Sequence, residues 1–228
     1  MMRRLLFERV ACAGGVTMAT ASGQHHVIKE AGESVGQLLQ NVFKESGYKR
    51  VHLVVAAPKQ EAIEGKLPAV CVYLYNISLD DEGLGSNRTG QFIETVVGPD
   101  GRQREVARDM PLWVRLDYLV STWAQTPEEE QLLMGGAIKG LLEHPTISGA
   151  DLKGESWKQD SFIPLTLSQK LDEGVLSRFW ASINQPMKPA IQCWTTVPIY
   201  PAGEVEIRRV QEKDVRFFDL NKLNKVKR

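Results

Sequence analysis

Apolar residues recur every three or four positions in three segments of the chain, which is the spacing of one face of a helix. The first segment covers residues 27–43 and is followed by Gly47, a residue favoured just beyond helix ends. The second begins at Thr126 with Pro127 and three glutamates, a combination typical of a helix N-terminus. The third covers residues 168–183. The pattern therefore predicts three helices.

Five other segments are continuously apolar or alternate between apolar and polar residues, as strands do. They cover residues 50–57, 69–77, 112–123, 160–167 and 190–200. Residues 69–77 are apolar on both faces, which predicts a central strand covered on both sides. Because helices and strands are mixed without strict alternation, we expect an α+β fold with a mixed or antiparallel sheet and about three helices.

A polar insertion at about residues 78–109 separates two of these strands. Within it, residues 91–97 and 102–108 flank a Gly-Pro-Asp-Gly sequence, which predicts a β-hairpin. A hairpin with one strongly polar strand buries little on its own. We therefore expect it to project from the core and either to move freely or to bind a partner.

The sequence pattern divides the chain into three parts. Residues 1–26 resemble a leader that is disordered or lies partly upstream of the true start, since Met18 is a second possible start. Its apolar run, residues 5–7, is too short for a signal peptide, so we expect neither secretion nor anchoring. Residues 27–200 form the folded domain, and residues 201–228 form an extension with a basic tail.

Charge and composition narrow the classes of function. The 228 residues carry 28 Lys and Arg against 28 Asp and Glu, a formal net charge of zero. A neutral protein has no long-range field to attract nucleic acid or an anionic membrane, and no apolar run reaches the ~20 residues of a membrane span. We expect no nucleic-acid partner and no direct membrane insertion. A near-neutral surface also favours self-association.

The sequence contains no nucleotide-binding, metalloprotease or nucleophile-elbow motif. Its cysteines, Cys12, Cys71 and Cys193, form no CxxC pair, and the last two lie in strand-like segments where buried thiols are unreactive. We therefore expect no enzymatic activity, no cofactor and no metal. One alternative stays open, a small cytosolic enzyme whose cleft joins Cys71 or Cys193 to His52 or His144.

Several landmarks follow one another along about residues 28–200. They are VCVYLYNI at 70–77, Asn87-Arg88, PLWVRLDYLVSTWA at 111–124, EEEQLLMGGAIKGLLEHP at 128–145, a helix containing Phe179-Trp180, and QPMKPAIQCWTTVPI at 185–199. This series resembles the cap, or tail-tube terminator, proteins of extracellular contractile injection systems, the antifeeding-prophage and virulence-cassette particles related to phage tails. The strand ending in LDYLVSTWA, followed by a helix with an acidic start, is its most specific part.

The resemblance implies an α+β subunit like phage tail terminators that assembles as a ring, commonly a hexamer. Such a ring would sit on the distal end of the inner tube, end its polymerisation and anchor the sheath. It would assemble in the cytoplasm as part of a phage tail-like particle, with tube and sheath subunits as partners and without catalysis, cofactor or metal. A phage tail-completion or head-to-tail joining protein is the alternative among structural proteins.

A ring closed by head-to-tail contacts needs two different complementary surfaces on each subunit. The hairpin and the C-terminal extension carry alternating apolar residues on segments too exposed for a core, and both suit strand addition to a neighbour. We therefore expect subunit or sheath contacts at Phe92, Ile93, Val96, Val97, Arg102, Arg104, Val205, Ile207, Arg208 and Arg209. The alternative is that both segments are mobile surface elements.

Overall fold

A computed structural model describes residues 25–48, 50–79, 90–98, 100–157, 161–168, 173–201 and 204–206. Within them, the helices are α1 (Val27–Glu45), α2 (Gln60–Ile63), α3 (Pro127–Glu143) and α4 (Glu173–Ser182), with a short 3-10 helix at Gly149–Asp151. The strands are β1 (His52–Val54), β2 (Ala69–Leu79), β3 (Gln91–Val97), β4 (Gln103–Asp109), β5 (Leu112–Trp123), β6 (Thr146–Ser148), β7 (Phe162–Pro164), β8 (Thr166–Leu167), β9 (Ala190–Ile199) and β10 (Glu204–Glu206).

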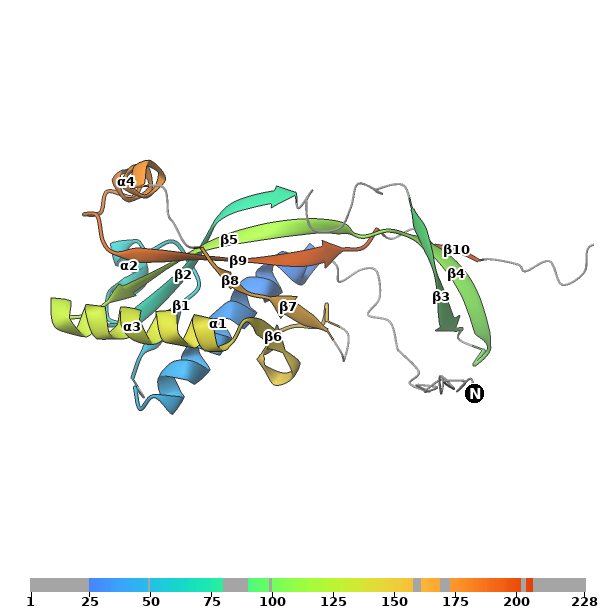
Figure 1. Cartoon of the computed structure of the whole chain (residues 1–228), viewed down its shortest axis with the longest axis horizontal. Coiled ribbons are helices and arrows are strands. Elements are labelled where there is room, and N and C mark those ends of the chain that lie inside the picture. Colours follow the sequence, from blue (N-terminus) through green and yellow to red (C-terminus); the bar gives the residue numbers. More distant parts are fainter. Residues whose placement is uncertain are drawn as a thin grey trace, which may run out of the picture.

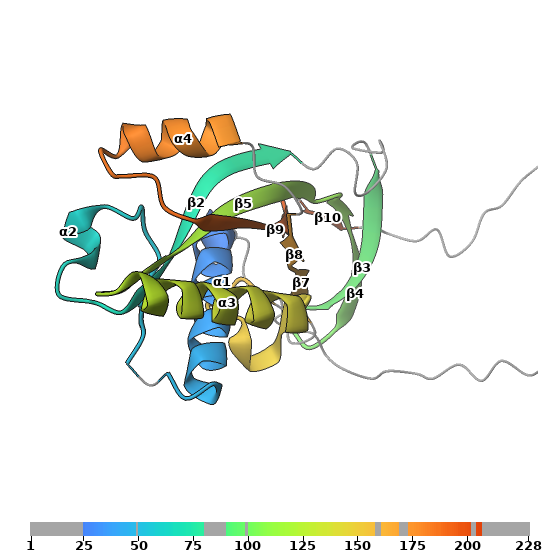
Figure 2. The same cartoon turned by 60° about the vertical axis from the view of Figure 1, so that its left-hand side comes forward.

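The central sheet has five strands in the order β1-β2-β5-β9-β8. β1 and β2 run parallel, and every other neighbouring pair is antiparallel, so the sheet is mixed. Helices cover it on both sides, with α1 and α3 on one face and α4 on the other (Figures 1 and 2). The expected α+β class and mixed sheet are confirmed.

The main core lies between the central sheet and the pair α1 and α3. Alternate residues of β5 point into it, from Val114 through Leu116 and Tyr118 to Val120, as the alternation in the sequence predicts. The apolar side of α1 faces them, and Leu39 at its centre is fully buried. This is the amphipathic packing that the spacing of residues 27–43 indicates.

α3 begins as the sequence predicts and packs closely on α1. The Thr126 hydroxyl accepts a hydrogen bond from the Glu129 amide at 3.3 Å, and Pro127 occupies the first turn. A Cβ atom added to Gly140 would lie 2.6 Å from Cγ1 of Val42, so only glycine permits this approach of the two helices. Gly136 is similar, since a Cβ there would lie 2.9 Å from Cε1 of Phe43, so both glycines allow the close helix–helix contact.

A second core lies on the opposite face of the sheet, under α2 and α4. Leu176 and Trp180 of α4 pack there with Leu119 and Trp123 of β5. The spacing of Val175, Leu176, Phe179 and Trp180 predicts that all four lie on the inner side of the helix, but Val175 is exposed. α4 turns Leu176 and Trp180 directly to the sheet, with Phe179 partly buried beside them, and this orientation leaves Val175 at the outer border.

The segment expected as one strand at residues 160–167 is two short strands in different sheets. β7 pairs with β6, whereas β8 pairs with β9 at the edge of the central sheet. The Leu165 amide donates to the carbonyl of Pro145 at 2.8 Å, which extends the pairing of β6 and β7 by one residue before the chain enters β8.

The loop over residues 149–157 is fastened along α1 by hydrogen bonds to a buried carboxylate. Glu30 accepts from the amides of Glu155 and Ser156 at 3.1 and 3.0 Å. Gly154, directly before these two residues, has a φ of +97°. A Cβ atom added to it would lie 2.0 Å from Cδ of Glu30. Trp157 closes the loop by donating from Nε1 to the Lys153 carbonyl, and it packs against the main core.

The predicted hairpin is confirmed as β3 and β4, and β10 adds to it as a third antiparallel strand. We call these three strands the arm sheet. It lies beyond the ends of β5 and β9, apart from the helices (Figure 1). In the turn, Gly101 has a φ of +74°, as a hairpin turn of this composition requires. The arm sheet is therefore a separate structural unit at one end of the molecule.

Candidate subunit interface

One face of the arm sheet carries an apolar stripe that crosses all three strands. Ile93, Ala107 and Val205 lie directly opposite one another in register, and Val97 follows on the same side of β3. Ile93 and Val205 are each 62% exposed, with the small Ala107 buried between them. We call these four residues the arm stripe. Thr95 and Glu105 lie on the same face between Ile93 and Val97, so the face is apolar across the three strands at Ile93 and mixed toward the tip.

The opposite face of the arm sheet is half-buried and holds the arm to the rest of the chain. Phe92 makes an edge contact with the ring of Tyr200, directly after β9, at a centroid distance of 6.4 Å. Next to it, Nε of Arg108 lies 3.5 Å from Oε2 of Glu94. Phe92 therefore supports the position of the arm, and it lies on the face away from the stripe.

The tip of the hairpin is positively charged. Nη2 of Arg104 lies 3.0 Å from Oδ2 of Asp100, and Asp100 also accepts a hydrogen bond from the Arg102 amide. The hydrogen bond from Arg104 is the main reason why the pKa of Asp100 is lowered. The side chain of Arg102 is exposed. With two arginines and one aspartate, the tip carries an excess positive charge.

The ten predicted contact residues thus fall into separate groups. Ile93, Val97 and Val205 share the exposed face, Phe92 and Val96 lie on the other face, and Arg102 and Arg104 belong to the tip. Ile207, Arg208 and Arg209 lie outside the described residues. Alternation along β3 separates the two faces, but the sequence alone does not tell which of them turns toward Tyr200.

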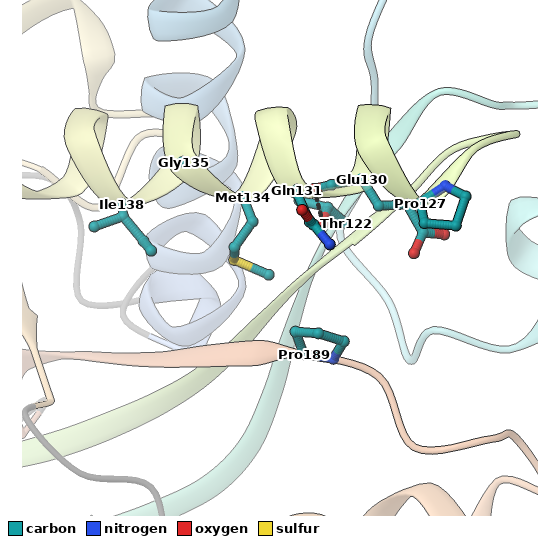
Figure 3. Close-up of a pocket in the computed structure, with 8 residues that line it drawn as sticks. All are labelled: Thr122, Pro127, Glu130, Gln131, Met134, Gly135, Ile138 and Pro189. Atoms are coloured by element: carbon teal, nitrogen blue, oxygen red, sulfur yellow. Dashed lines mark hydrogen bonds between the residues drawn. The ribbon is translucent and has the colours of Figure 1, made fainter.

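A second apolar surface, on α3, is one that sequence reasoning missed. Met134, Ile138 and Leu142 follow at steps of four on the side of the helix turned away from α1, and Leu142 is 70% exposed. Met134 and Ile138 line a pocket of about 400 Å³ together with Pro189, just before β9 (Figure 3). We call this surface the α3 groove. The spacing of four residues is present in the sequence. It was overlooked because other apolar residues of α3 also recur at helical spacing and pack into the core.

Fixed contacts and an acidic residue define the beginning of the α3 groove. Lys188 donates to Oε1 of Glu130, and its ammonium lies 4.4 Å from the centroid of the Trp123 ring. These contacts hold the segment before β9 against the first turn of α3. Glu128 is exposed and lies two turns before Gly135, on the same side of the helix. Thr122 and Gln131 also line the pocket, so the α3 groove combines apolar and polar side chains.

A third feature is a polar cluster on the part of the central sheet that α4 leaves uncovered. Asp117 is buried and accepts hydrogen bonds from Asn76, Arg115 and Gln192 at 2.9, 3.0 and 3.3 Å. A bulge in β2 after Leu74 shifts the register so that Asn76 lies opposite Asp117. The charge of Asp117 is balanced by Arg115, and its hydrogen bonds connect β2, β5 and β9.

The two cysteines of the described residues are buried on opposite faces of the central sheet. Burial raises the pKa of both Cys71 and Cys193 to about 12, so both are protonated thiols at neutral pH. Nδ1 of His144 lies 2.9 Å from the carbonyl oxygen of Gly140 at the end of α3. A protonated thiol inside a core is a poor nucleophile, which is unfavourable to the cysteine–histidine alternative.

Among the described residues, no helix is both long and apolar enough to cross a membrane. Within the same part of the chain, His, Cys, Asp and Glu side chains form no group of three or more suited to a metal ion.

Comparison with known proteins shows that the chain matches one protein family and that its fold is similar to those of solved structures. Residues 30–212 match the family described as the Pvc16 N-terminal domain. No curated protein sequence matches the chain. The solved sheath/tube terminator of the extracellular contractile injection system PVC, in its extended state, has a similar fold, with a TM-score of 0.54 and 15% identity over 85% of this chain and 68% of that chain.

The cap of the anti-feeding prophage, described as its tube-terminating cap, is also similar. The TM-score is 0.53 and the identity 18%, over 74% of this chain and 55% of that chain. The chain thus spans little more than half the length of that cap. At these identities the likeness concerns the fold.

Proposed function

Since the chain belongs to the Pvc16 N-terminal domain family, we propose that it is the structural cap of a contractile injection system. The observation that carries the proposal is that its fold is similar, over 85% and 74% of its length, to two proteins described as tube terminators. The arm stripe and the α3 groove support it, because a terminator must bind other protein subunits through exposed surfaces.

In this proposal, copies of the chain form a ring, commonly a hexamer, on the distal end of the inner tube. A tube of identical subunits keeps growing as long as its last layer offers a free binding surface. A ring that covers this layer and offers no equivalent surface ends the growth. The same ring anchors the surrounding sheath, and assembly takes place in the cytoplasm before the particle is released.

The proposed function needs no catalysis, which agrees with the chemistry of the described residues. The thiols of Cys71 and Cys193 are protonated inside two separate cores. The carboxylate of Asp117 is occupied by three hydrogen bonds from neighbouring strands. These side chains stabilise the subunit.

The direct test is the length of tubes assembled with and without this chain. Purified tube subunits from the same injection system are polymerised with increasing amounts of the protein, and tube lengths are measured by electron microscopy. We expect shorter tubes with a ring on one end, and a length that falls as the ratio of cap to tube subunit rises. A length distribution that does not depend on this ratio would overturn the proposal.

A further inference from the structure

We propose that the arm sheets of neighbouring subunits join edge to edge, with β3 of one copy paired to β10 of the next. The proposal rests on the proposed function, because it assumes that copies of the chain form a ring. It goes further by naming the two strands, the face that their side chains share and the residues whose backbone makes the contact.

The arm sheet, at one end of the molecule, has two different open edges (Figure 1). In the order β10-β4-β3, β4 is paired on both sides, whereas β3 and β10 each have one strand partner among the described residues. A ring of identical subunits needs two different surfaces on each copy, one for each neighbour. The two edges of one sheet meet this need. A strand of any other protein would cover one edge and leave the second open.

β3 has the properties of an edge strand that binds another strand. It is seven residues long, contains no proline, lysine or bulge, and pairs regularly with β4 throughout. The central sheet is different, because it ends in β1 and β8, of three and two residues, and a bulge interrupts β2 beyond β1. Proteins commonly shorten, bend or charge their edge strands, since a long uncharged edge pairs with other chains. The single charged residue of β3, Glu94, lies on the half-buried face.

The backbone of β3 presents outward-facing hydrogen-bonding groups at every second residue. The amide of Met110 donates to the carbonyl of Gly90, and the amide of Gly98 donates to the carbonyl of Arg102, so the even-numbered residues of β3 bond to β4. In an antiparallel pair, the residues between them turn their amide and carbonyl groups away from the partner strand. These outward-facing groups belong to Gln91, Ile93, Thr95 and Val97.

β10 presents the matching pattern. The even-numbered residues of β4 bond to β3, so Ala107 bonds to Val205 opposite it, and the residues on either side of Val205 turn their backbone groups outward. β3 and β10 both run antiparallel to β4, so a copy that continues the sheet presents its β10 parallel to β3. In parallel pairing, a residue bonds to both neighbours of the residue beside it. Val205 of one copy therefore lies beside an odd-numbered residue of the adjoining β3.

The side chains at the two edges match as well. Val205 and the odd-numbered residues of β3 share one face, and the apolar row of Ile93, Ala107 and Val205 crosses the sheet from edge to edge. Ile93 and Val205, the ends of this row, are each 62% exposed. Joining the copies brings the ends of neighbouring rows together. In a hexamer, the joined arm sheets form a barrel of about 18 strands, a size that encloses an open channel and leaves no edge strand.

Cysteine cross-linking tests this pairing through its alternation. Val205→Cys is combined with a cysteine at each position of β3 in turn, in a Cys12→Ser background. Within one chain, β4 keeps the two cysteines at least about 10 Å apart, too far for a disulfide. Mild oxidation with copper phenanthroline should therefore link neighbouring subunits into a ladder, at odd-numbered positions such as Ile93→Cys or Val97→Cys. Val96→Cys, on the opposite face, is the matched control and should give no ladder.

A proline substitution gives a second readout that does not depend on oxidation. Thr95→Pro removes an outward-facing amide and leaves the hydrogen bonds between β3 and β4 in place, so the hairpin should still fold. It should weaken ring formation by about tenfold or more at each contact, whereas Thr95→Ala, which keeps the amide, should not.

Hydrogen exchange of the wild type provides a measurement without any substitution. The amides of Ile93, Thr95 and Val97 should exchange about tenfold or more slowly in the ring than in the diluted monomer, because only the ring pairs them. The amides of the even-numbered residues of β3 bond to β4 and should be protected in both states.

Ladders at odd-numbered positions alone, loss of the ring in Thr95→Pro and protection of the odd-numbered amides would support the inference. An intact ring with no ladder at any odd-numbered position, or with an equal ladder at Val96→Cys, would overturn the strand pairing and leave the cap function standing. Protection that appears only after tube or sheath subunits are added would overturn it in favour of another partner. If the wild-type chain neither forms a ring nor shortens tubes, the proposed function itself fails.

Discussion

The central sheet has helices on both faces, whereas the arm sheet leaves its apolar stripe in contact with water. Both sheets are built from strands with alternating side chains, so the strands themselves do not account for the difference. Leu116 at the middle of β5 is fully buried under α1, while Ile93 at a similar place in β3 is mostly exposed. The comparison shows that the central sheet buries its apolar side chains within the subunit, whereas the arm sheet leaves part of its own exposed, where we propose that partners bind.

The hairpin of the arm sheet is joined to the central sheet at a single narrow point. The arm begins after Gly90 and returns at Met110, and the amide of Met110 donates to the carbonyl of Gly90 at 3.1 Å. The two ends of the hairpin are thus already side by side at the border of the central domain. Changes in the arm need not be transmitted to the core, and changes in the core should not alter the exposed stripe directly.

The largest expected difference is between matched truncations in the two sheets. Leu116→Ala removes a fully buried side chain and should lower the free energy of unfolding by about 2–5 kcal/mol. Ile93→Ala removes an exposed one and should change it by no more than about 0.5 kcal/mol. Urea unfolding followed by tryptophan fluorescence measures both. Similar losses in the two variants would mean that the arm is part of the stabilising core.

A smaller effect is expected where the loop over residues 149–157 is fastened to α1. Gly154→Ala adds a Cβ next to Glu30 at a positive φ and should cost about 1–3 kcal/mol. Gly149→Ala is the matched control, since Gly149 also has a positive φ but open space around it. Thermal unfolding of the two variants separates the collision from the backbone strain. Equal losses would show that the carboxylate moves aside freely.

Two glycines of α3 should respond in opposite directions. Gly140→Ala pushes against Val42 of α1, so we expect it to destabilise the fold by about 1–3 kcal/mol. Gly135→Ala points into the open α3 groove and should stabilise the helix by up to about 1 kcal/mol. Denaturant midpoints for the two variants make the comparison. A loss of stability in Gly135→Ala would place that side of α3 inside the fold of a single subunit.

The smallest effect concerns the buried thiols and appears only at high pH. The pKa of Cys71 and Cys193 is raised from 9.0 to about 12 in the folded protein, so the unfolded chain loses these protons first as the pH rises. Their contribution to stability is complete below pH 9 and decreases between pH 9 and 12. In a Cys12→Ser background, neither thiol should react with a thiol reagent at pH 8 until the protein unfolds. Rapid labelling of the folded protein would contradict their burial.

Much of the fold could be predicted because its signals are local. The spacing in residues 27–43, the cap at Thr126 and the alternation in β5 each depend on a few neighbouring residues, and all three are confirmed. The division of residues 160–167 between two sheets could not be predicted, because the partners of β7 and β8 are far apart in the sequence.

The candidate interface could be predicted only in part. The hairpin and its apolar residues follow from the sequence, but the face that stays exposed depends on the contact of Phe92 with Tyr200. The α3 groove was not predicted, because Leu133, Ala137 and Leu141 recur at helical spacing too, and these are the residues that pack into the main core. Met134 and Ile138 form a pocket because Pro189, the residue before β9, lies opposite them, and the sequence does not show this proximity.

Deletion of residues 91–108 tests most directly whether the central domain folds without the hairpin and whether ring assembly needs the hairpin. The contact between Gly90 and Met110 allows the deletion to close without strain on the core. The mass of the particle in solution and the unfolding midpoint are measured for the wild type and the deletion. We predict a closed ring, six times the mass of one chain, for the wild type, and a monomer with an unchanged midpoint for the deletion. A deletion variant that still forms the same ring would contradict this division of roles between the two sheets.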